Sequence, residues 1–73
     1  MNPPETAPKD GTIFLAHVGY PYLTVCRWNA PSSKWVVALP QTNFYDGAWD
    51  DFYFENEFED ENQLLGWIPL PIA

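Results

Sequence analysis

The stretch Thr12–Leu39, "TIFLAHVGYPYLTVCRWNAPSSKWVVAL", decides the fold. It holds three runs rich in β-branched and aromatic residues, at 12–18, 22–29 and 34–39, and the turn-forming segments "GYP" and "APSS" separate them. Short runs of this composition between turn signals are typical of strands, and we expect the first two to pair as a hairpin. The N-terminal half therefore predicts antiparallel β-structure.

The segments on either side complete the sheet. Residues 1–11 form an irregular, proline-rich leader that ends in a Lys-Asp-Gly turn, and residues 41–50 are predicted to be a loop. Asp51–Phe58 alternates with period two and is predicted as a strand, followed by a turn through "EDEN" and a last short strand over 64–70. A short helix over Glu57–Leu65 is the alternative, because this segment is rich in good helix formers.

The alternation over 51–58 also predicts which side chains are buried. We expect Phe52, Phe54 and Phe58 to share one face and to reach the core. The opposite face then holds an outward row of polar side chains: Tyr53, Glu55, Glu57 and Glu59.

The 73 residues allow a single small domain, 1–73, whose core needs its large aromatic side chains. Strands that recur every eight to twelve residues favour an all-β fold, or a β-rich fold with one short helix. We expect a small antiparallel meander or SH3-like barrel of about four to five strands.

Composition narrows the functional classes. The single cysteine, Cys26, excludes an internal disulfide and a cysteine-based zinc cluster, which favours a reducing compartment. The sequence shows neither a signal-peptide pattern nor an apolar stretch of the length that crosses a bilayer, so we expect a soluble intracellular protein. A net charge of −7 disfavours direct binding to nucleic acid or to an anionic membrane.

The acidic residues are concentrated in one part of the chain. Eight of the ten lie within residues 46–61, whereas all three bases precede Trp35. On a strand, Glu55, Glu57 and Glu59 would form a row whose spacing is near that of successive phosphates. Such a row can imitate nucleic acid toward a basic protein surface, or it can simply be a solvated face that keeps the domain soluble.

Other constellations give weaker signals. Asp46, Asp50 and Asp51 are oxygen ligands suitable for Ca²⁺, but their spacing is not that of an EF-hand loop, so no metal or cofactor is predicted. His17 and Cys26 lie in neighbouring predicted strands without a third orienting group. Burial explains both residues better than catalysis does, and no catalytic residue or enzymatic activity is predicted.

The four tryptophans divide into two groups. We expect Trp28 and Trp35 to face each other across a hairpin and Trp67 to anchor the final strand in the core. Trp49 lies beside Asp50 and Asp51 in the predicted loop. Exposed aromatic residues in such a position are typical of binding hot spots.

Two short motifs stand near the ends of the sequence: T-A-P-K-D-G-T at Thr6–Thr12, before a hydrophobic strand, and W-x-P-L-P at Trp67 with Pro69, Leu70 and Pro71. In these two motifs the chain resembles a group of small, uncharacterised phage and prophage proteins, whose members open and end in this way. The resemblance leaves 41–62 unmatched. It implies a phage origin, action in the cytoplasm of the bacterial host, and a shared framework in which the two ends clasp one small sheet.

These observations lead to three functional hypotheses. The first is an inhibitor that binds a host protein through its basic, nucleic-acid-binding groove, such as a CRISPR effector or another defence nuclease. The second is a structural or accessory module that self-associates, as a homodimer for example, and the third is a protein that sequesters a signal nucleotide. For the first hypothesis the predicted partner-binding residues are Tyr45, Asp46, Trp49, Asp50, Asp51, Tyr53, Glu55, Glu57, Glu59, Asp60 and Glu61.

Overall fold

Five strands form one antiparallel sheet in the order β4-β3-β2-β1-β5. The computed structural model describes the backbone of residues 1–45 and 48–70 and the side chains of residues 1–39 and 55–70. The strands are β1 (Phe14–His17), β2 (Thr24–Asn29), β3 (Lys34–Tyr45), β4 (Ala48–Glu59) and β5 (Gly66–Pro69). Within the described residues the only helices are single 3-10 turns, η1 (Pro4–Thr6) and η2 (Glu61–Gln63). The predicted all-β class is confirmed.

The connections follow the predicted meander from β1 to β4. The hairpin between the first two strands is confirmed, with Phe14 opposite Cys26 and Leu15 opposite Val25. After η2 the chain crosses to the opposite edge of the sheet, where β5 pairs with β1. The turn predicted through "EDEN" is therefore present, and the alternative helix over 57–65 is not formed.

The sheet buries one of its two faces, which we call the core face. Phe14, Cys26 and Val37 stand opposite one another in the register of β1, β2 and β3, and each is almost fully buried. Alternate side chains of a strand point to opposite faces, so the neighbours of these residues belong to the other side. The core cluster comprises Ala7, Phe14, Ala16, Cys26, Trp35, Val37, Leu39 and Leu64.

Aromatic rings contact one another through the centre of the core. The ring of Phe14 meets Trp35 edge-on at 5.6 Å between centroids and Trp67 at 5.5 Å. Trp28 packs against Trp35 at 4.8 Å, and the two are register partners across the β2–β3 hairpin. The predictions that these two tryptophans face each other and that Trp67 packs at the core are confirmed.

The leader covers the core face and fastens β5. Asn2 pairs with Trp67 through two backbone hydrogen bonds, and the Trp67 indole N–H donates to Pro3 O and Thr6 Oγ1, both at 3.1 Å. The predicted turn before β1 is also present, because Asp10 Oδ1 accepts the Thr12 N–H at 3.0 Å and Gly11 adopts a φ of 91°. The two ends of the described chain therefore clasp the sheet.

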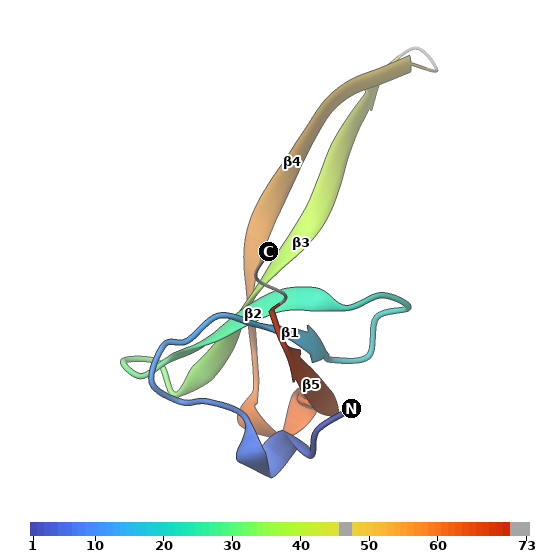
Figure 1. Cartoon of the computed structure of the whole chain (residues 1–73). Coiled ribbons are helices and arrows are strands. Elements are labelled where there is room, and N and C mark those ends of the chain that lie inside the picture. The colour runs from blue at the N-terminus through green and yellow to red at the C-terminus, as the bar shows by residue number, and fades with distance from the viewer. Residues whose placement is uncertain (46–47, 71–73) are drawn as a thin grey trace.

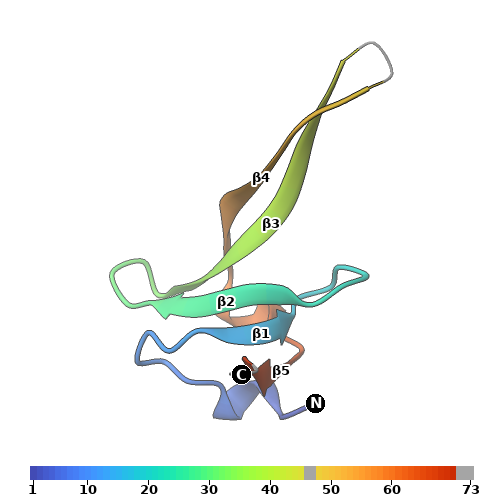
Figure 2. The ribbon, with the colours of Figure 1, turned by 45° about the horizontal axis from the view of Figure 1, so that its top comes forward.

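The predicted loop over 41–50 is wrong wherever the backbone of this segment is described. β3 continues to Tyr45 and β4 begins at Ala48, so residues 41–45 and 48–50 belong to a long antiparallel pair of strands. β2 stops pairing with β3 at Ala38, and beyond that point the described backbone of β3 pairs only with β4. We call residues 40–45 and 48–54 the arm. It extends well beyond the other three strands (Figure 1; Figure 2).

The predicted orientation of β4 is also wrong where its side chains are described. Phe58 is 53% exposed, and it stands opposite Val36, whereas Glu57 stands opposite the buried Val37. A register shift between Asn43 and Phe44 leaves Asp50 as an extra residue on β4. One extra residue exchanges the two faces of a strand, and alternation within 51–58 does not reveal it. Phe52 and Phe54 lie outside the described side chains.

Candidate protein-binding surface

The acidic row of β4 lies along an edge of the sheet. Glu55, Glu57 and Glu59 stand opposite Leu39, Val37 and Trp35 in the register, which places all three carboxylates on one side of the strand. Residues two apart on a strand are about 6.6–6.8 Å apart along it. Glu55 and Glu57 are exposed, and Glu59 is half-buried. The row lies on the same side of the sheet as the core face. It is nevertheless accessible, because β4 is an edge strand.

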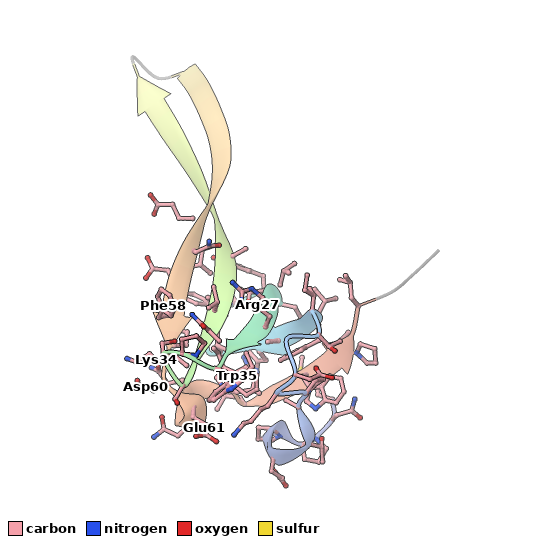
Figure 3. All side chains as sticks on the ribbon, turned by 90° about the vertical axis from the view of Figure 1, so that its left-hand side faces the viewer. Arg27, Lys34, Trp35, Phe58, Asp60 and Glu61 are labelled. Carbon is pink, nitrogen blue, oxygen red and sulfur yellow. The ribbon has the colours of Figure 1, made fainter. Side chains whose placement is uncertain are left out.

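Two of the candidate acids contact bases of the same chain. Glu61 forms an ion pair with Lys9, whose ammonium also lies 4.6 Å from the centre of the Trp28 ring. Asp60 Oδ1 lies 3.1 Å from Lys34 Nζ, and the two side chains approach each other beside η2 (Figure 3). These contacts tie the leader and β3 to η2. Asp60 and Glu61 therefore offer less free charge than the sequence suggests.

Glu59 has a local role as well. Its carboxylate accepts the Tyr20 hydroxyl at 3.4 Å, and Tyr20 packs against the core cluster. Desolvation, followed by the repulsion of the nearby carboxylate, raises the pKa of Tyr20. Among the described side chains, Glu55 and Glu57 are the β4 carboxylates that have neither an ion pair nor a hydrogen bond. They are the acids of the row whose charge is available to a partner.

Six of the predicted partner-binding residues lie between positions 45 and 53 of the sequence. Tyr45, Trp49 and Asp50 lie on β3 and β4 instead of in the predicted loop, whereas Asp51 and Tyr53 lie on a strand as predicted. Only the backbone of these five residues is described. Asp46 lies outside the described residues, and so do the side chains of Asp50 and Asp51, which are the other possible Ca²⁺ ligands. Within the described part of the chain no cluster of His, Cys, Asp or Glu is arranged to hold a metal ion.

Cys26 and His17 do not form a pair. The thiol lies on the core face, where its residue is 1% exposed, and His17 alternates with Ala16 onto the other side of β1. Burial, with a smaller contribution from the Glu59 carboxylate, raises the pKa of the Cys26 thiol to about 12. The thiol therefore stays protonated at neutral pH and is a poor nucleophile.

Sequence reasoning missed the exposed face of the sheet. Opposite the core face, a depression is lined by Ile13, Val25, Arg27, Val36, Ala38 and Asn56. Ile13 is 48% exposed and Val25 41%. We call these six residues and Phe58 the open face. The alternation in "TVCRWN" carries the signal for it, because Val25 and Arg27 cannot share a side with Cys26 and Trp28.

Comparisons with known proteins assign no family to this chain. No family model matches the chain, and neither a curated protein nor a solved structure matches it significantly. No helix in the described residues is long and apolar enough to cross a membrane.

Proposed function

We propose that this chain is a non-enzymatic binding protein whose acidic strand β4 binds a basic, nucleic-acid-binding surface of another protein. The observation that carries the proposal is the position of Glu55 and Glu57. Both are exposed on one side of an edge strand, and neither is neutralised by a base among the described side chains. A surface that binds phosphates through Lys and Arg accepts carboxylates in such a row.

The finer form of the proposal concerns the partner. We propose that it is a protein of the bacterial host, such as a CRISPR effector or another defence nuclease, which this chain inhibits by occupying its groove in the cytoplasm. The resemblance of both chain ends to phage proteins supports this choice. Occupation of a groove requires no catalytic group, and complementary charge gives fast, salt-sensitive association.

A capture experiment with matched charge variants tests the proposal. The variant Glu55→Gln with Glu57→Gln should lose the capture of a basic protein from bacterial lysate at least tenfold, because two unpaired carboxylates of the row are removed. Excess double-stranded DNA should displace the same protein from the unmodified chain. Quantitative mass spectrometry of the captured fraction measures both effects.

The control changes the same charge elsewhere. Glu5→Gln with Asp10→Asn also removes two acids, at exposed positions of the leader, and Asn keeps a side-chain oxygen for the Thr12 N–H. This variant should capture the partner as the unmodified chain does. Equal capture by both variants, or a captured protein that DNA does not displace, would contradict the proposal that the acidic row imitates nucleic acid.

A further inference from the structure

The open face is an apolar surface with one positive charge in it. Three of its apolar residues are about half exposed: Ile13 at 48%, Val25 at 41% and Phe58 at 53%. Arg27 lies among them, opposite Val36 in the register. In the described side chains the two ion pairs of the protein involve Lys9 and Lys34, so Arg27 is the base that pairs with no carboxylate. An occupant of this face needs apolar side chains and an acid.

The arm has the complementary composition. Its residues include six of the thirteen aromatic residues of the chain, together with Asp50 and Asp51, and no base. Its backbone forms a two-stranded ribbon that no third described strand supports. Such a ribbon is marginally stable in water unless its side chains pack against another element. The arm therefore requires a surface that the body of its own chain does not provide.

The arm cannot reach the open face of its own chain. β3 and β4 run without a break from the sheet into the arm, so the ribbon leads away from the body (Figure 1; Figure 2). Arg27 and Phe58 lie in the part of the body where the ribbon leaves it (Figure 3). A chain reversal at that point would break the continuous β3–β4 pairing. The surface that receives the arm has to belong to another molecule.

The dimensions fit a second copy of this chain. Six residues of β3, opposite seven of β4, give the arm a length of about 20 Å, and five strands spaced by about 4.8 Å make a sheet roughly 19 Å wide. In the β3–β4 register, four of the six aromatic residues belong to one side of the ribbon: Phe44, Trp49, Phe52 and Phe54. Four such side chains, each burying roughly 150–250 Å², supply roughly 600–1,000 Å² per chain. A stable interface of standard size needs about 800 Å² per partner.

We propose that two copies form a symmetric dimer in which the arm of each lies across the open face of the other, with Arg27 paired to Asp50 of the second copy. The exchange is reciprocal and closed, so it ends at two chains. It leaves Glu55 and Glu57 accessible, because their row lies on the opposite side of the sheet from Arg27. The dimer is independent of the binding partner proposed above.

Charge exchange between two variants tests this arrangement with purified protein alone. Sedimentation equilibrium should give the unmodified chain twice its 8.4 kDa mass. Arg27→Glu should weaken dimerisation at least tenfold, and so should Asp50→Arg with Asp51→Arg, because each variant sets like charges against each other at both contacts. A mixture of the two variants should form a heterodimer, in which both contacts join opposite charges.

A matched variant controls for the change in net charge. Ser32→Glu with Asn62→Glu adds two negative charges at exposed positions outside the open face. The net charge therefore changes by two units, as it does in Arg27→Glu. This variant should remain dimeric, and circular dichroism should show all variants folded. A monomeric unmodified chain, a dimer indifferent to Arg27→Glu, or a mixture that stays monomeric would each overturn the proposal.

Discussion

At the scale of single residues, Trp35 joins three other elements of the molecule: β1, β2 and η2. Its ring contacts Phe14 and Trp28, and its indole N–H donates to Glu61 O at 3.1 Å. The hydrogen bond fastens η2 against β3 on the core side. A substitution that removes the indole N–H of Trp35 therefore removes a hydrogen bond and part of a buried ring at once.

We predict that Trp35→Phe lowers the free energy of unfolding by about 2–4 kcal/mol, from the lost hydrogen bond and the volume of the missing ring atoms. Urea titration followed by circular dichroism measures the change. Trp28→Phe is the control, because Trp28 is only half-buried and meets Trp35 edge-on, without an indole hydrogen bond in the described contacts. A greater loss in Trp28→Phe than in Trp35→Phe would contradict this account.

At the scale of elements, the arm separates from the body of the sheet. The core residues described above lie on the body side of Leu39, and Leu39 stands opposite Glu55 in the register. Residues directly opposite at the end of a hairpin can be joined by a two-residue turn. The arm can therefore be replaced without changing the rest of the sheet.

We predict that replacing residues 40–54 by Asn-Gly leaves a folded monomer. The near-ultraviolet circular dichroism of Trp28, Trp35 and Trp67 should persist, because the contacts that fix these rings lie in the body. Sedimentation equilibrium should show that dimerisation is lost. An unfolded product would mean that the body depends on the arm, and a dimeric product would place the interface elsewhere.

The elements also show why part of the fold was predictable from the sequence. The runs at 12–18, 22–29 and 34–39 end at clear turn residues, and all three became β1, β2 and the start of β3. The segment 41–50 has no such regular pattern and contains a register shift, so it resembled a loop. The face of Phe58 depended on that one extra residue, and no local signal specifies it. The acidic row was found, but the ion pairs of Asp60 and Glu61 depend on distant bases.

At the scale of the whole molecule, alkaline pH acts on folding through the buried thiol. An unfolded Cys26 releases its proton near its ordinary pKa of 9.0, whereas the folded one holds it up to about pH 12. The folded state therefore binds more protons than the unfolded state between these values, and stability falls as pH rises from 9 to 12. Tyr20, whose pKa is also raised, acts in the same direction.

We predict that Cys26→Ala reduces this fall. The thiol contributes a slope of at most about 1.4 kcal/mol per pH unit, and the variant lacks that contribution whatever its own stability at neutral pH. Urea titrations at several pH values between 9 and 12 measure both slopes. Parallel curves for the two proteins would show that the thiol does not remain protonated in the folded state.

The pairing of β1 with β5 has a consequence for how the protein is made. β1 lies inside the sheet, yet one of its two neighbours is encoded some fifty residues later, at Gly66–Pro69. While the ribosome is still translating that interval, one edge of β1 has no neighbouring strand. The Trp67 indole, which donates a hydrogen bond to Pro3 O of the leader, has not yet been synthesised. Emergence of β5 from the ribosome, and not formation of the first hairpin, therefore sets the moment at which β1 stops being open to association with another chain.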